Sequence, residues 1–223
     1  MFSAQGKLCS ETAELIRLDG HAANVRAVAV SSDGTLVASG GEDATVIVHV
    51  WDRHCNMAAD KQVLKGHKES VLSVALSQDG KLAVSSSMDA TTLVWRLETG
   101  KVEALLEIDS IIAVDVSLSS DASVVATGME DGSIVLWDVS SAQGLLMIKT
   151  GAALGSVAVL TRSGPCDSKP TSQFPQLTNL CVVSGHSDKS VRMWDAATGV
   201  PLLGSNDCSG ILRTPVERFM VRT

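Results

Sequence analysis

Large aromatic side chains are scarce in this sequence, which has four Trp, three Phe and no Tyr among its 223 residues. A core built around many aromatic anchors is therefore excluded. The 45% of residues that are hydrophobic still supply ample core material, and it must come mainly from Val, Leu, Ile and Ala. Abundant β-branched residues favour strands, and a chain of this length forms one large domain or two smaller ones.

Basic clusters are also absent, since no run of five Lys or Arg occurs and the formal net charge is −7. Binding to nucleic acid or to an anionic membrane surface needs a basic face, so we predict neither partner. No apolar stretch approaches the roughly 20 residues that span a bilayer. The first residues carry no apolar core of the signal-peptide type.

Cysteine pairs at the spacing of metal or redox motifs are missing as well. The five cysteines are odd in number and scattered, with no Cys-x-x-Cys, and no Asn-x-Ser/Thr glycosylation site occurs. This pattern predicts reduced thiols and a cytoplasmic location, with the nucleus as an alternative. The cysteines are Cys9, Cys55, Cys166, Cys181 and Cys208.

What the sequence does contain is a repeat. Residues 20–52 read GHAANVRAVAVSSDGTLVASGGEDATVIVHVWD, and residues 66–95 read GHKESVLSVALSQDGKLAVSSSMDATTLVW. Two weaker copies follow, and self-similarity at this period indicates a repeat architecture. The equivalent valines Val28, Val74, Val116 and Val157 are spaced 46, 42 and 41 residues apart.

Each copy predicts short antiparallel strands joined by tight turns. In the first copy, alternating residues predict strands at 25–30, 36–39 and 45–51, with turns at Ser32-Asp33-Gly34 and around Asp43. The last copy holds 16 extra residues rich in Pro, Ser and Thr, which predicts an insertion loop at 161–179. The other predicted strands are 14–18, 63–65, 71–77, 82–85, 92–95, 102–106, 113–119, 124–127, 133–138, 145–148, 154–160, 180–184, 190–195 and 201–203.

The Gly-His pair, the Ser-Asp-Gly hairpin, the aspartate turn and the closing Trp-Asp resemble the WD-repeat β-propeller family over about residues 14–203. The resemblance implies an all-β propeller of four-stranded antiparallel blades. About four blades are present, which predicts a partial propeller, because rings of this kind usually have about seven blades and propellers span about four to eight. The predicted units are a disordered N-terminus at 1–13, blades at 21–65, 67–107, 109–148 and 150–203, and an irregular tail or partial strand at 204–223.

The resemblance also implies a buried hydrogen-bonded tetrad of His, Ser or Thr, Asp and Trp in each blade, which holds the aspartate turn. In the first copy the Trp follows the Asp by eight residues instead of six, so His49 is an alternative for its position. In the third copy Ile108-Asp109 replaces Gly-His, and we predict no intact network there. Lys149-Thr150 stands at that place in the fourth copy. The assigned residues are His21, Ser39, Asp43 and Trp51; His67, Ser85, Asp89 and Trp95; Thr127, Asp131 and Trp137; and Ser184, Asp188 and Trp194.

By the same resemblance, the Gly-His loops and the aspartate turns open on one face, where partners of this family usually bind. We predict that a protein partner binds there. Met88 and Met129 stand where a polar turn residue is usual, and methionine suits an adaptable contact surface, although local packing explains both residues equally well. The candidate contact residues are Arg26, Glu42, Lys68, Glu69, Met88, Ile111, Met129, Glu130 and His186.

The residues do not favour an enzyme. The structural tetrads account for the His, Ser and Asp residues, and neither Gly-x-Ser-x-Gly nor Gly-x-x-x-x-Gly-Lys-Ser/Thr occurs. His49, His54 and Cys55 are too few for a metal site, and a polar connector loop explains them better. We therefore predict a non-enzymatic scaffold or adaptor with no catalytic residue, no metal and no cofactor.

Other functions stay open at this point. The chain could be a sensor or regulatory module of a larger NTPase-type signalling protein, an enzyme, or a truncated product. The neighbouring coding sequence would identify the first of these. An open ring also predicts self-association, because unpaired strand edges invite pairing with another chain.

Overall fold

The computed structural model describes residues 17–52, 57–108, 110–162 and 174–202, and these form four antiparallel β-sheets. The first sheet contains β1 (Val25–Val30), β2 (Leu36–Gly41), β3 (Thr45–Asp52) and β4 (Met57–Lys65). The second contains β5 (Val71–Leu76), β6 (Leu82–Ser87), β7 (Thr92–Arg96) and β8 (Lys101–Leu106). The third contains β9 (Ala113–Leu118), β10 (Val124–Met129), β11 (Ser133–Asp138) and β12 (Gly144–Lys149), and the fourth contains β13 (Leu154–Thr161), β14 (Leu180–His186) and β15 (Val191–Asp195).

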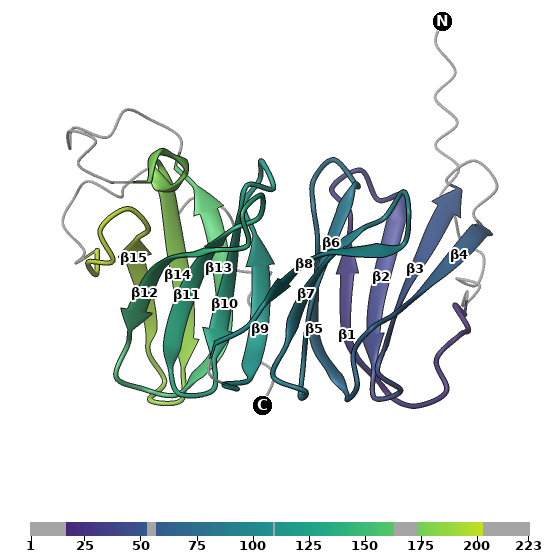
Figure 1. Ribbon diagram of the computed structural model, residues 1–223, viewed down its shortest axis with the longest axis horizontal. Coiled ribbons are helices and arrows are strands. Elements are labelled where there is room, and N and C mark those ends of the chain that lie inside the picture. The colour runs from purple at the N-terminus through teal and green to yellow at the C-terminus, as the bar shows by residue number, and fades with distance from the viewer. Residues whose placement is uncertain (1–16, 53–56, 109, 163–173, 203–223) are drawn as a thin grey trace, which may run out of the picture.

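The sheets are the blades of a partial propeller, so the predicted all-β fold is confirmed. Figure 1 shows the four blades side by side, with the first at one end of the molecule and the fourth at the other. The inner strand of each blade packs against the inner strand of the next, in the order β1, β5, β9 and β13. Neighbouring blades therefore meet face to face, and the core lies between them.

The core consists of three apolar layers, one at each junction between blades. Val74, Val116 and Val157 are 7%, 5% and 5% exposed, because each lies on an inner strand that the preceding blade covers. Each layer contains a single tryptophan among aliphatic side chains, which agrees with the scarcity of aromatic residues. These tryptophans are Trp95, Trp137 and Trp194.

A repeated side-chain motif sets the turn between the first two strands of three blades. In the first blade the Ser31 hydroxyl donates to Asp33 over 2.6 Å and accepts from the Leu36 N–H over 2.9 Å. The pairs Ser77–Asp79 and Ser119–Asp121 make the equivalent bond at 2.7 and 2.6 Å. Such local side-chain bonds replace the backbone hydrogen bonds between strands, and the strand ends there.

The structure departs from the predicted elements in several places, and β4 begins at Met57 instead of at residue 63. The fourth blade has three described strands, because Pro201 forms only an isolated bridge with Trp194. Arg17 and Leu18 belong to no strand, whereas residues 14–16 of that predicted strand lie outside the described residues. The insertion contributes a 3₁₀ helix, η1 (Pro175–Leu177), whose Leu177 is buried, and residues 163–173 lie outside the described part.

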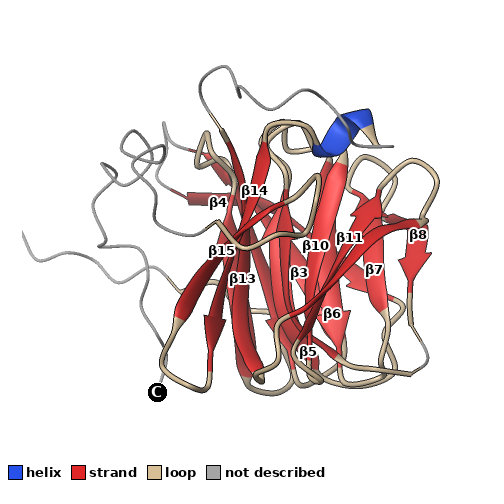
Figure 2. Ribbon diagram, turned by 90° about the vertical axis from the view of Figure 1, so that its left-hand side faces the viewer, coloured by secondary structure: helices blue, strands red, loops and turns tan. Residues whose placement is uncertain are grey.

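Figure 2 shows the strands running between two ends of the molecule, with η1 at one of these ends. Because only two residues separate η1 from the first residue of β14, η1 lies at the end opposite the aspartate turns. In the described residues no helix has the length and apolar character needed to cross a bilayer. The predicted disordered N-terminus and C-terminal tail lie outside the described part of the chain.

Candidate functional site at the aspartate-turn face

The turns that follow the second strand of each blade, together with the loops that precede each inner strand, form one end of the molecule, here called the aspartate-turn face. The same backbone bond joins turn to loop in all four blades. Each is 2.9 Å long: Glu42 N to Asn24 O, Met88 N to Ser70 O, Glu130 N to Ile112 O, and Ser187 N to Ala153 O. The face is therefore held by the fold itself, independently of any tetrad.

The second blade has a continuous side-chain network beneath its turn. The Trp95 indole N–H donates to Ser85 Oγ over 2.8 Å, and Ser85 Oγ lies 2.7 Å from His67 Nε2. His67 Nδ1 lies 3.2 Å from Asp89 Oδ2, which also accepts from the Lys68 N–H over 2.7 Å. Every donor finds an acceptor if Ser85 donates to His67 Nε2 and His67 Nδ1–H donates to Asp89.

The environment favours this neutral form of His67. Burial lowers the pKa of His67, and the attraction of Asp89 opposes that effect without overcoming it. Burial would raise the pKa of Asp89, but hydrogen bonds from Thr91 and the Lys68 N–H lower it overall, so its carboxylate is ionised. The network thus joins a neutral imidazole to a carboxylate and leaves no buried donor unpaired.

The first blade contains the same His, Ser and Asp contacts but not the tryptophan. His21 lies 2.9 Å from Ser39 Oγ and 3.0 Å from Asp43 Oδ1. Burial would raise the pKa of Asp43, yet hydrogen bonds from the Ala22 N–H, His21 and Thr45 outweigh it and lower the pKa to about 2. No described hydrogen bond joins Trp51 to this group, which corrects its assignment.

Strand register explains the displacement of Trp51. Trp95 lies opposite Ala83, Trp137 opposite Val125 and Trp194 opposite Val182, and in the first blade the residue at this register is His49, opposite Val37. Since β3 has eight residues, Trp51 lies two residues further along the strand, where its backbone N–H donates to Thr35 O. His49 is buried, and burial lowers its pKa.

The third blade retains only part of the network. The Trp137 indole donates to Thr127 Oγ1 over 2.8 Å, in the same geometry as in the second blade. Asp131 is exposed, and the bonds described for it come from the N–H and hydroxyl of Ser133, at 2.8 and 2.6 Å. Asp109 lies outside the described residues.

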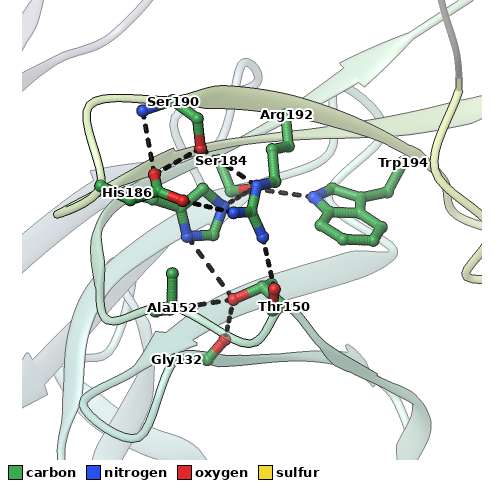
Figure 3. Close-up of polar contacts among 9 residues, drawn as sticks. Gly132, Thr150, Ala152, Ser184, His186, Ser190, Arg192 and Trp194 are labelled. Carbon is green, nitrogen blue, oxygen red and sulfur yellow. Dashed lines mark hydrogen bonds and ion pairs between the residues drawn. The ribbon is translucent and has the colours of Figure 1, made fainter.

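The fourth blade builds its network from a different histidine, as Figure 3 shows. Ser184 Oγ accepts from the Trp194 indole over 2.8 Å and lies 2.8 Å from Nε2 of His186, which belongs to the same strand. Thr150, at the Gly-His place, lies 3.5 Å from His186 Nδ1 and donates to Gly132 O over 2.5 Å.

Asp188 of this blade bonds to residues other than the histidine. It accepts from the N–H and hydroxyl of Ser190 and forms an ion pair with Arg192. Arg192 also donates to the Thr150 carbonyl, so it connects Asp188 to the residues drawn in Figure 3. Sequence reasoning missed this role of His186, although a Ser-Gly-His triplet at 184–186 occurs in no other copy at that position.

These networks can hold turns but are poorly placed for catalysis. The hydroxyl-bearing residues Ser39, Ser85, Thr127 and Ser184 are 9%, 0%, 1% and 1% exposed, so a substrate could not reach them. In the part of the chain that the structure describes, no three His, Cys, Asp or Glu side chains are grouped as metal ligands would be. His54 and Cys55 lie outside the described residues.

Two of the candidate contact residues are buried, which corrects their assignment to the surface. Met129 is 3% exposed because its side chain joins the core between the second and third blades. His186 is 9% exposed because it is part of the fourth-blade network. Met88, in contrast, is 46% exposed.

The remaining candidates lie at the surface of the aspartate-turn face. Arg26 forms an ion pair with Glu42 at 2.6 Å, and Asn24 donates to the same carboxylate over 3.1 Å. Ile111 is half-buried, and the other three are exposed: Lys68, Glu69 and Glu130. The face is therefore mainly charged, with Met88 as an exposed apolar side chain on one of its turns.

Comparison with known proteins gives two findings. A family model described as "WD domain, G-beta repeat" matches residues 13–52, 59–96, 109–138 and 166–195. The small ribosomal subunit protein RACK1y of Oryza sativa subsp. japonica is 29% identical over 131 residues, which cover 56% of this chain and 37% of the relative. The chain thus spans little more than a third of the length of that relative.

Proposed function

Because this chain belongs to the WD-repeat family, we propose that it is a non-enzymatic scaffold that binds a protein partner on its aspartate-turn face. The observation that carries this proposal is the exposed side chain of Met88 on that face. The name of the rice relative places that protein in a ribosomal subunit, and a role in a protein assembly is in keeping with the proposal. The predicted cytoplasmic location, with the nucleus as an alternative, belongs to the same proposal.

The backbone around Met88 is fixed from both sides. The Met88 N–H donates to Ser70 O over 2.9 Å, and the Ser87 hydroxyl donates to Glu69 O over 2.9 Å. Asp89, the next residue, belongs to the second-blade network. A flexible thioether on a rigid turn combines adaptable packing with a fixed position, which suits a contact residue.

The surroundings of Met88 indicate the chemistry of the partner. The turn positions equivalent to Met88 are occupied by Glu42, Glu130 and Ser187, and Glu69 is exposed in the same blade. Met88 is therefore an apolar residue among charged neighbours of both signs, because Lys68 is exposed beside Glu69 and Arg26 pairs with Glu42. We infer that the partner offers a small apolar pocket with a charged rim.

The test is capture of partners from cells by the tagged chain and by its Met88→Asp variant, followed by mass spectrometry. We expect the variant to lose partners that the wild type captures, because a carboxylate cannot enter an apolar pocket without a partner. Thermal stability should change little, since an exposed side chain is replaced. Met129→Asp is unsuitable, because Met129 is buried and a charge there would destabilise the fold.

Met147→Asp is the matched control. Met147 is 45% exposed on the outer strand β12, away from the aspartate turns, so this variant should capture the same partners as the wild type. Retention of all partners by Met88→Asp would overturn the proposal, as would equal loss in both variants.

A further inference from the structure

The first blade exposes an apolar sheet face that every other blade buries. Val28 is 60% exposed, whereas its equivalents Val74, Val116 and Val157 are 7%, 5% and 5% exposed. Val25 and Val30 on the same strand are 51% and 62% exposed. The difference has a simple cause: the equivalent valines are covered by a preceding blade, and no described residues cover the first blade in this way.

The fourth blade exposes the complementary surface at the other end of the molecule. A Cβ atom on Gly40 would lie 2.5 Å from Val71 of the next blade, and one on Gly128 would overlap Leu154. At the equivalent Gly185, nothing in the described residues lies within 4 Å. Val191 beside it is 71% exposed, against 1% and 0% for its equivalents Val46 and Ile134.

We propose that these two faces bind each other between two copies of the chain. Val25 and Val28 of one copy would cover Gly185 and Val191 of the other, as Val71 covers Gly40 and Leu154 covers Gly128 within the chain. Val183, which lies further from the aspartate turns on the same face, is already buried. The contact therefore uses the half of the face that is nearest the aspartate turns. The surface thus offers its own complement, and the occupant that fits it is a second copy.

Two such contacts close a ring. The faces lie at opposite ends of the molecule in Figure 1, so one copy cannot join them without changing shape. Two copies with four blades each give eight blades, within the range of about four to eight that propellers have. A head-to-tail contact that closes in this way yields a defined dimer instead of a filament.

The new junction would bury no unpaired charge. At the junctions on both sides of the third blade, Asp115 bonds to Ser73 and to Ser156. The residue equivalent to Asp115 in the first blade is Ala27, so the junction between the first two blades has Ala27 and Ser73 at these positions and no carboxylate. The proposed junction pairs Ser156 with Ala27 and so has the same composition as that existing one.

The experiment measures the mass of the full chain in solution by light scattering and by sedimentation over a range of concentrations. We expect a dimer, that is, about twice 23.3 kDa. Val28→Asp and Val191→Lys should each weaken dimerisation at least tenfold, because both junctions of either variant's homodimer carry the new charge. Their circular dichroism spectra should match the wild type, since both side chains are exposed in the single copy.

Mixing the two variants gives the sharpest test. In the mixed pair, one junction is wild type, and the other places the carboxylate introduced by Val28→Asp against the ammonium group introduced by Val191→Lys, so the dimer should return. Val63→Asp is the matched control, because Val63 is 43% exposed on the outer strand β4, and it should remain a dimer. A monomeric wild type, higher oligomers, or dimers that survive both substitutions would overturn the proposal.

This proposal and the partner proposal fail separately. Met88→Asp should leave the dimer intact, because Met88 lies on a turn outside both end faces. Val28→Asp should leave capture through the aspartate-turn face intact, because Val28 lies on strand β1 and not on an aspartate turn.

Discussion

Asp89 and Asp131 occupy the same place in successive turns but make different contacts. Asp89 is largely buried and accepts bonds from His67, Thr91 and the Lys68 N–H. Asp131 is exposed and is bonded to Ser133. The contribution of the turn aspartate to stability therefore depends on whether a histidine bonds to it.

Asp89→Ala should lower the free energy of unfolding by about 1–3 kcal/mol, because it removes the one carboxylate that accepts from His67, Thr91 and the Lys68 N–H. Asp131→Ala is the matched comparison and should cost less than about 1 kcal/mol. Urea denaturation of the two variants measures both values. Equal losses would contradict the role assigned to the second-blade network.

The complete network could be predicted from sequence only in the second copy, which supplies all four residues at the usual spacing. These are His67, Ser85, Asp89 and Trp95. His186 could not be placed, because it reaches Ser184 from within the same strand instead of from the preceding loop. The burial of Met129 could not be predicted either. Met88 and Met129 occupy adjacent positions of the repeat, and one of these positions is exposed whereas the other is buried.

At the scale of single elements, the turns hold residues whose backbone favours glycine. Gly34, Gly80 and Ala122 are equivalent, and their φ angles are 69°, 68° and 58°. Glycine reaches this left-handed region without strain, whereas an alanine side chain meets the backbone there. The third blade thus has a strained residue where the first two have glycine.

Ala122→Gly should raise the free energy of unfolding by about 0.5–1 kcal/mol, because relief of the left-handed strain exceeds the added entropy of the unfolded chain. The reciprocal change Gly80→Ala should lower it by a similar amount. Thermal unfolding of both variants tests the pair. A stabilising Gly80→Ala would show that strain does not govern these turns.

The strands could be located from sequence because Asp, Gly and Ser at regular spacing mark their ends. Their pairing could not be predicted in full. The pairing of the inner strand with its neighbour shifts register near the aspartate-turn end in all four blades: between Val25 and Ala27, between Val71 and Ser73, between Gly128 and Met129, and between Leu154 and Ser156. The bulge lies at the end of each strand, where too few residues follow it to show the shift in alternation, so it has no clear sequence signal.

At the scale of the whole molecule, the number and order of blades followed from the repeat spacing, but the exposure of the two end faces did not. Val28 and Val74 are the same residue type at the same repeat position. Only the presence of a neighbouring blade makes one exposed and the other buried. Burial in such an architecture is a property of the junction, because each repeat contacts only its neighbours.

Asp115 links three blades through a single carboxylate. It lies on β9, and its Oδ1 accepts from Ser73 of the second blade over 2.6 Å. Its Oδ2 accepts from the hydroxyl of Ser156 over 2.7 Å and from the Val157 N–H over 2.8 Å, both in the fourth blade. These bonds cross two junctions that are otherwise apolar.

Asp115→Ala should therefore lower stability by about 1–3 kcal/mol and reduce cooperativity, because both junctions lose polar bonds at once. Asp115→Asn retains an acceptor for the Val157 N–H and a donor for Ser73, so it should recover at least half of the loss. Urea denaturation gives the free energies and the slopes, and hydrogen exchange reports whether the outer blades open separately. An unchanged slope together with a loss below about 0.5 kcal/mol for Asp115→Ala would show that apolar packing alone joins the blades.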